Sequence, residues 1–149
     1  MRTRLLTLTI ALAGAFAGGA FAADGMSKDA YKAAKDKIET QAKADKKACE
    51  AMKDNAQDVC EAEAKAKEKI AKAELDAQNK PGARADEKVR MTKAEGTYEV
   101  AKEKCEDQKG TAAEACKKDA RVAYDKARAD AQAKGASDTR AAGANKPKS

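Results

Sequence analysis

Large hydrophobic residues are sparse along most of this 149-residue chain, and where they occur they recur at helical intervals. Tyr31, Ile38, Met52 and Val59 share one heptad position, and alanines continue the stripe. A narrow, alanine-rich stripe suits close contact between helices. Alanine, lysine and glutamate favour helix and fill most of the other positions. The pattern therefore predicts an all-α protein whose first helical region runs from about residue 27 to 79.

A break between two helical regions is predicted at residues 79–83, where a Pro-Gly pair ends one helix and opens a turn. The second region follows from about 84 to 134, and Ser27 is the expected N-cap of the first. Both regions form one helical domain, residues 23–134, arranged as an alanine-rich hairpin or a small up-down bundle. Residues 135–149 contain glycine, serine and proline and are predicted to form a disordered tail.

Acidic residues precede lysines by four positions at several places in the first region. This order favours pairing along one helix, and each pair contributes about 0.2–0.5 kcal/mol. We therefore expect these charges to form solvated helix faces. The pairs are Glu39 with Lys43, Glu61 with Lys65, Glu63 with Lys67, Glu68 with Lys72, and Asp76 with Lys80.

Four cysteines provide the strongest motif. Cys49 and Cys60 are eleven residues apart, and so are Cys105 and Cys116. Both blocks fit the pattern C-E-x-x-K-x-x-A-x-[DE]-x-C, with a period of 56 residues. The two helical regions are therefore predicted to be copies of one duplicated unit.

Geometry limits how these cysteines can pair. An unbroken helix rises about 16 Å over eleven residues, whereas a disulfide needs Cα atoms within about 7 Å. Cys49 cannot bond Cys60 unless the chain reverses between them. Two pairings remain. The chain forms either Cys49–Cys60 with Cys105–Cys116, or Cys49–Cys116 with Cys60–Cys105 in one long hairpin.

The local pairing is the preferred prediction because the second unit carries a reversal signal. Gly110 suits a helix end, and Thr111-Ala-Ala-Glu114 reads as a capping box. The first unit has only the weaker Asp54-Asn55 at this place, without the glycine. The hydrophobic stripe keeps its phase across the first Cys block, which favours the long hairpin and keeps that alternative open.

The first 22 residues are predicted to be a Sec-type secretory signal peptide. Arg2 and Arg4 form a positive start, residues 5–13 are apolar, and Ala20-Phe21-Ala22 resembles a cleavage site. The chain is therefore expected in the periplasm, with no stable membrane span once the signal is removed. An oxidising periplasm would allow disulfides to form and persist.

Without this leader the chain cannot build an ordinary core. It then has no Phe, Trp or His. Its few large aliphatic residues offset little of the backbone entropy of folding, about 1–2 kcal/mol per residue. Disulfides are therefore expected to stabilise its tertiary structure. The aliphatic residues are Ile38, Val59, Ile70, Leu75, Val89, Val100 and Val122.

We find no catalytic or metal-binding constellation in this sequence. Without His, acid–base chemistry would fall to exposed carboxylates and lysines, whose pKa values have little apolar surface to shift them. Zinc sites normally show short Cys pairs, which this chain lacks. We therefore predict no enzyme activity, no cofactor and no metal. The only predicted site residues are the disulfide cysteines Cys49, Cys60, Cys105 and Cys116.

The net charge of the chain indicates which class of binding partner to expect. The formal net charge is +6, and it falls to +4 when Arg2 and Arg4 leave with the signal. Mixed charges with a small positive excess favour weak contact with anionic envelope surfaces or envelope proteins. Basic residues alternate with acids and there is no aromatic platform, so nucleic-acid binding is not expected. An alanine-rich seam this thin also suits homo-oligomer formation.

The Cys blocks and their flanks resemble a family of small exported proteobacterial proteins rich in Ala, Lys and Glu. The matching segments include Asn55-Ala-Gln-Asp-Val-Cys60, Ala30-Tyr-Lys-Ala-Ala-Lys35 and Val100-Ala-Lys-Glu-Lys-Cys105. Members are often labelled TolA-like or cell-envelope-biogenesis proteins and have no established activity. The resemblance implies an envelope protein but no reaction.

Three hypotheses for function follow. The first is a non-catalytic structural or interaction protein of the periplasmic envelope, with a stress-related role. The second is a hydrophilic stress protectant resembling late-embryogenesis-abundant proteins, which would be disordered in dilute solution. The third is a cysteine-based metal or redox protein, which would require free or reactive thiols.

Overall fold

A computed structural model describes residues 25–144, and the predicted signal peptide lies outside the described residues. Four helices follow one another along the chain: α1 Lys28–Cys49, α2 Asp54–Asn79, α3 Ala83–Cys105 and α4 Thr111–Ala144. The all-α class is confirmed. The break predicted at 79–83 is also confirmed, since α2 ends and α3 begins there.

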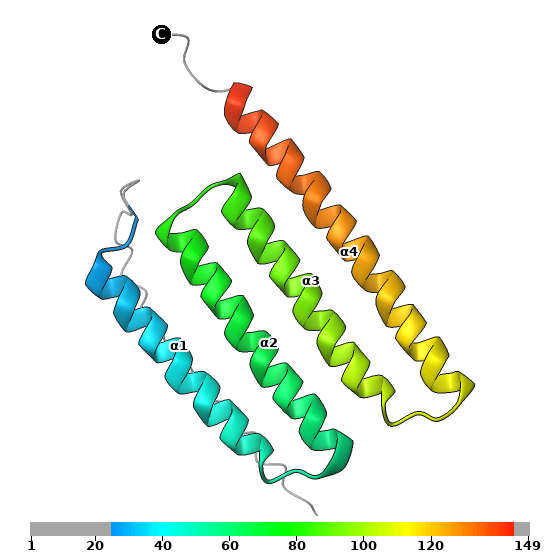
Figure 1. Cartoon of the computed structure of the whole chain (residues 1–149). Coiled ribbons are helices and arrows are strands. Elements are labelled where there is room, and N and C mark those ends of the chain that lie inside the picture. Colours follow the sequence, from blue (N-terminus) through cyan, green and yellow to red (C-terminus); the bar gives the residue numbers. More distant parts are fainter. Residues whose placement is uncertain (1–24, 145–149) are drawn as a thin grey trace, which may run out of the picture.

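The helices run up and down in one layer, in chain order (Figure 1). α1 contacts α2, α2 contacts α3, and α3 contacts α4, while no other pair of these helices is in contact. The predicted up-down bundle is confirmed, in the form of a row that does not close around a shared core. Each of the two inner helices therefore packs on two neighbours, and each outer helix packs on one.

Small residues fill the seams between neighbouring helices. The buried apolar residues of the described chain are six alanines, Leu75 and two cysteines. At the α2–α3 seam, a Cβ placed on Gly96 would lie 3.0 Å from the Cβ of Ala66. The two helices therefore approach closely at this point, which larger side chains would prevent.

The first helical region is two helices rather than one. The chain reverses between Cys49 and Asp54, so the predicted stripe through Tyr31, Ile38, Met52 and Val59 is interrupted. Met52 lies in the turn and is 45% exposed. The heptad spacing of the hydrophobic residues continues across this turn, although the turn is not helical. The prediction of one continuous helix from that spacing was therefore wrong.

The tail predicted from residue 135 is wrong for residues 135–144, which extend α4. Gly135 is buried against the side chain of Glu87 on α3. Asp138 accepts a hydrogen bond from Arg90 at 3.1 Å. These contacts with α3 hold the helix where glycine and serine alone suggested disorder. Residues 145–149 lie outside the described part.

Both reversals use a residue with positive φ at the same place in the predicted repeat. Gly110 has φ +60° and Asp54, 56 positions earlier, has φ +52°. A positive φ is easy for glycine and unfavourable for a residue with a Cβ, with aspartate among the more tolerant types. The helix reversal in the second unit was therefore predictable from its glycine. Asp54 adopts the same conformation in the first unit, but an aspartate is not a specific sequence signal for it.

The helix starts were predicted with mixed success. Ser27 caps α1, accepting a hydrogen bond from the backbone N–H of Ala30 at 3.2 Å. α4 begins at Thr111 as predicted. Within the described residues, however, neither Thr111 nor Glu114 makes the side-chain bonds of a capping box. The backbone N–H of Glu114 instead donates to the carbonyl of Gly110 at 3.3 Å.

We predict that Asp54→Gly stabilises the oxidised protein by roughly 0.5 kcal/mol, because it removes the steric cost of a positive φ. The matched substitution Gly110→Ala should destabilise it by about 1 kcal/mol. Urea unfolding followed by far-UV circular dichroism measures both changes. A loss of stability in Asp54→Gly would contradict the assigned turn.

Candidate functional site: disulfide staples and an ionic face

All four cysteines of the described chain are paired locally. Cys49 bonds Cys60 and Cys105 bonds Cys116, each with a Cα–Cα distance of 5.6 Å. This separation is ordinary for a disulfide. The preferred pairing is confirmed, and the long-hairpin alternative is wrong because the chain reverses within each Cys pair.

The two disulfide bonds occupy equivalent places in the layer of helices. Cys49 ends α1 and Cys105 ends α3, and their partners lie early in α2 and α4. Cys49 and Cys105 are the most deeply buried side chains, with relative exposures of 0% and 1%. The α1–α2 and α3–α4 turns lie at the same end of the layer (Figure 1). Both disulfides therefore lie at one end of the layer, which we call the stapled end. The α2–α3 turn at the other end has no disulfide.

A cluster of four charged residues joins α1 to α2. Glu68 accepts hydrogen bonds from Lys46 and Lys72, each at 2.8 Å. Lys72 also lies 3.4 Å from Glu39 on α1. The hydrogen bonds from Lys46 and then Lys72 lower the pKa of Glu68 from 4.5 to about 2. The hydrogen bond to Glu68 raises the pKa of Lys72.

A second cluster joins three helices. The hydroxyl of Tyr31 on α1 donates to Asp76 on α2 at 2.6 Å, and Lys88 on α3 donates to the same carboxylate at 2.9 Å. The hydrogen bond from Tyr31, followed by that from Lys88, lowers the pKa of Asp76. The bond to Asp76 raises the pKa of Tyr31. Tyr31 thus contributes a hydrogen bond between helices, in addition to the packing expected from its place on the hydrophobic stripe.

The prediction of charge pairs along single helices is mostly wrong. Of the five predicted pairs, only Glu68 with Lys72 is present among the described residues. Glu39, Glu63 and Asp76 pair across a seam instead, with Lys72, Lys104 and Lys88 respectively. In a row of helices with small buried residues, long charged side chains reach the neighbouring helix. Sequence spacing alone cannot show this preference.

A pair of tyrosines covers the α3–α4 seam. The rings of Tyr98 and Tyr124 stack with centroids 4.9 Å apart. The guanidinium of Arg121 lies 5.7 Å from the Tyr124 ring and 6.0 Å from the Tyr98 ring. Such offset aromatic and cation–π contacts stabilise packing. This cluster is the largest aromatic contact of the described chain and was not predicted.

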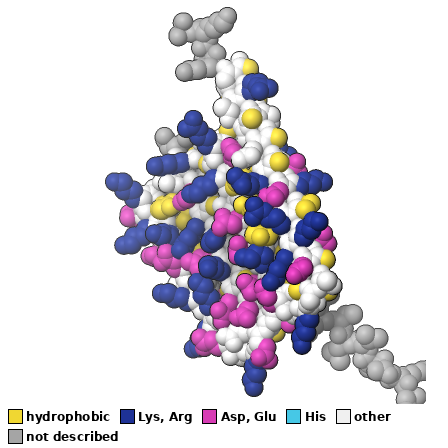
Figure 2. Space-filling view, turned by 45° about the vertical axis from the view of Figure 1, so that its right-hand side comes forward, with side chains coloured by type: hydrophobic (Ala, Val, Ile, Leu, Met, Phe, Trp, Pro, Cys, Tyr) yellow, Lys and Arg dark blue, Asp and Glu magenta, His cyan; other side chains and the backbone are white. Residues whose placement is uncertain are grey.

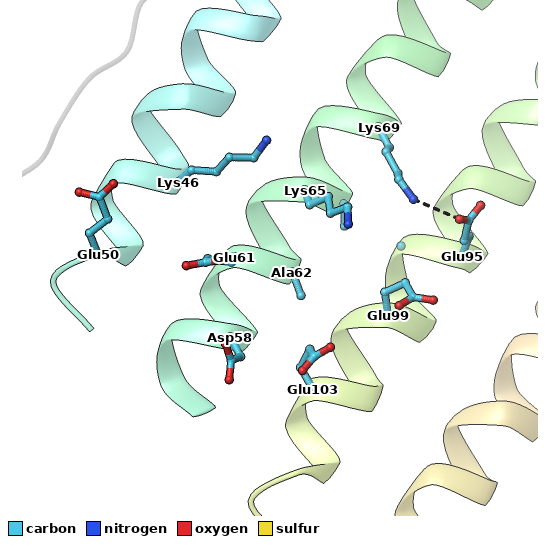
Figure 3. Close-up of a pocket in the computed structure, with 12 residues that line it drawn as sticks. Lys46, Glu50, Asp58, Glu61, Ala62, Lys65, Lys69, Glu95, Glu99 and Glu103 are labelled. Atoms are coloured by element: carbon cyan, nitrogen blue, oxygen red, sulfur yellow. Dashed lines mark hydrogen bonds and ion pairs between the residues drawn. The ribbon is translucent and has the colours of Figure 1, made fainter. Parts of the chain in front are cut away.

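A groove of about 480 Å³ crosses α1, α2 and α3 near the stapled end. Figure 3 shows Lys69 directed across the α2–α3 seam to Glu95, to which it donates at 3.1 Å. Most of the remaining side chains that line the groove are charged. They include Lys46, Glu50, Asp58, Glu61, Lys65, Glu99 and Glu103.

No group of three or more His, Cys, Asp or Glu residues within 25–144 is placed to hold a metal ion. In the same residues, none of the helices has the length and apolar character needed to cross a membrane. The features that the structure does define are the two disulfides at one end of the layer and the charge pairs between its helices.

No protein family, curated protein or solved structure matches the chain.

Removing either disulfide should lower the free energy of unfolding by about 3 kcal/mol, because each one restricts the unfolded chain. The two losses should be similar because the two disulfides close loops of the same length. We expect similar losses for the Cys49→Ala/Cys60→Ala and Cys105→Ala/Cys116→Ala double variants. Denaturant unfolding of each variant measures them. If both variants retained full stability, the disulfides would not be what holds the turns.

The Glu68 cluster predicts a pH dependence of stability. The pKa of Glu68 is lowered in the folded protein, so its contribution is fully present above pH 4.5 and is lost as pH falls from 4.5 to about 2. Glu68→Gln should cost about 0.5–1 kcal/mol at neutral pH, since its lysine partners stay partly solvated. The difference from the wild type should vanish near pH 2.

Glu61→Gln is the matched control, because Glu61 only accepts a hydrogen bond from Gln57 on its own helix. Unfolding of both variants should be followed between pH 2 and 7. A Glu68→Gln penalty that persisted unchanged at the acidic end would show that charge does not cause it.

Proposed function

We propose that this chain is a non-catalytic structural or interaction protein of a bacterial cell envelope, acting in the periplasm. The observation that carries this proposal is the pair of disulfides, each closing one helical turn at the same end of the layer. Disulfides of this kind indicate an oxidising compartment. The arginine-led apolar leader supports export to the periplasm in particular.

The architecture supports a structural or binding role. The disulfides and interhelical charge pairs hold a layer whose charged side chains remain largely at the surface. Figure 2 shows Lys and Arg side chains interspersed with Asp and Glu over the face in view. A surface of this type, with a small positive excess, favours weak and salt-sensitive contact with anionic envelope components.

Export is tested by fractionating cells that make the full chain, followed by intact mass spectrometry. We expect a periplasmic protein that begins at Ala23 and has lost four hydrogen atoms, two for each disulfide. Cytoplasmic protein with four free thiols would contradict the proposal and would favour the cysteine-based metal or redox alternative. Circular dichroism of the exported protein tests the protectant alternative, which requires a coil spectrum in dilute buffer.

Surface contact is tested by flotation of the exported protein with lipid vesicles. It should bind phosphatidylglycerol vesicles at low salt, bind phosphatidylcholine vesicles much less, and dissociate as the salt concentration rises. Salt-independent binding, or equal binding to both lipids, would contradict an electrostatic contact.

A further inference from the structure

The layer has two different faces, which are identified by two grooves along the α2–α3 seam. One groove contains the Lys69–Glu95 pair described above. The other is lined by the apolar residues Ile70, Val100 and Ala101 together with Thr97 and a few charged side chains. The two grooves share only Ala66 and Gly96, which lie buried at the seam itself. The grooves therefore open on opposite sides of the layer.

We call the side with the Lys69–Glu95 pair the ionic face and the opposite side the alanine face. On α1, Glu39 and Lys46 pair with α2 on the ionic face. The opposite side of α1 at heptad spacing carries Ala34, Gln41 and Ala48. The alanine face thus continues from the apolar groove across α1.

The same contrast holds on α4. Arg121 pairs with Asp125 and lies over the Tyr98 ring. Lys102 lies over the same ring and pairs with Glu99, which lines the groove of the ionic face. The helical period places Ala120, Ala123 and Ala127 towards the other side. Each of the four helices therefore presents some small apolar residues on the alanine face. Charged side chains also lie on this side of the α2–α3 seam, including Glu74, Asp86 and Arg90.

Three features of this face fit a second copy of the same chain. Domains normally bury such a surface against another layer, and this molecule has only one layer. Alanines allow helices to approach closely. Two charge pairs within the chain lie on this side of the α2–α3 seam, Glu63 with Lys104 at 3.0 Å and Glu74 with Lys93 at 2.7 Å, and they limit repulsion between two copies. Lys67 also lines the groove, and it makes no ion pair among the described residues.

The available area is also sufficient. The four helices have 22 to 34 residues and are therefore about 33–51 Å long, and neighbours lie about 8–10 Å apart. Four such helices in a row offer roughly 1,000 Å² on one face, compared with about 800 Å² per partner in a standard interface. We propose that two copies pack through their alanine faces and complete a two-layer helical core. This inference does not depend on the proposed envelope function.

The test is sedimentation equilibrium of the exported, oxidised protein over a wide concentration range. Thr97 is exposed and lines the apolar groove. Thr97→Arg would add bulk and a further cation to the groove that already contains Lys67 and Lys104, and the added charge would face the same lysines in the second copy. We expect a wild-type monomer–dimer equilibrium whose Kd is raised at least about tenfold by Thr97→Arg.

Gln132→Arg is the matched control, since Gln132 is exposed one heptad after Asp125 on the ionic face. It should leave the Kd unchanged, and circular dichroism should show that both variants keep the wild-type helix content. A wild-type protein that remains monomeric at every concentration would overturn the proposal and leave the face free for another partner. Equal weakening by both variants would also overturn it.

Cross-linking of isotopically light and heavy copies identifies the face independently. Amine cross-links between copies should involve Lys67 and Lys104 of the alanine face. A dimer cross-linked instead through Lys65 and Lys69 of the ionic face would contradict the assigned interface.

Discussion

The fold depends on the covalent closure of two helix reversals. In each reversal a buried cysteine ends one helix and bonds a cysteine early in the next. The seams beyond these turns contain alanines, one leucine and two glycines, and such residues bury little apolar area. Restricting the unfolded chain at two places lowers the entropy that these thin seams must offset. Small buried residues are therefore sufficient here, and they also permit the close approach of α2 and α3 at Gly96.

The charged side chains add a second level of organisation. Glu68 and Asp76 on α2 each receive bonds from more than one helix, which connects α1, α2 and α3 on the ionic face. Each pair contributes modestly because its members stay partly solvated. Their combined effect is to fix the register between neighbours that small residues would leave weakly specified. The opposite face also has interhelical pairs, Glu63 with Lys104 and Glu74 with Lys93. It differs in its groove at the α2–α3 seam, which is lined by Ile70, Val100 and Ala101.

Several elements could be predicted because their signals are local. The Pro-Gly break, the Ser27 cap and the helix reversal at Gly110 each depend on residues within a few positions, and the structure has all three. The Gly110 signal made the local disulfide pairing the preferred prediction, while the long-hairpin pairing stayed open until the structure was described. The reversal at Asp54 was harder to recognise, because aspartate only occasionally adopts a positive φ.

Other features depend on contacts between helices and could not be read from spacing. Residues 135–144 were predicted to be disordered from their composition, yet contacts with Glu87 and Arg90 on α3 support them as helix. The partners of Glu39, Glu63 and Asp76 changed for the same reason. The Tyr98–Tyr124 stack requires α3 and α4 to lie side by side, which the sequence did not establish before the pairing of the cysteines was known.

Peptide mass spectrometry under non-reducing conditions tests the central claim most directly. Trypsin can cleave after Lys53 and Lys109, which lie between the cysteines of each pair. The structure predicts that the peptide containing Cys49 is linked to the one containing Cys60, and that Cys105 is likewise linked to Cys116. Peptides linking Cys49 to Cys116 or Cys60 to Cys105 would contradict the stapled reversals and the helical layer built on them.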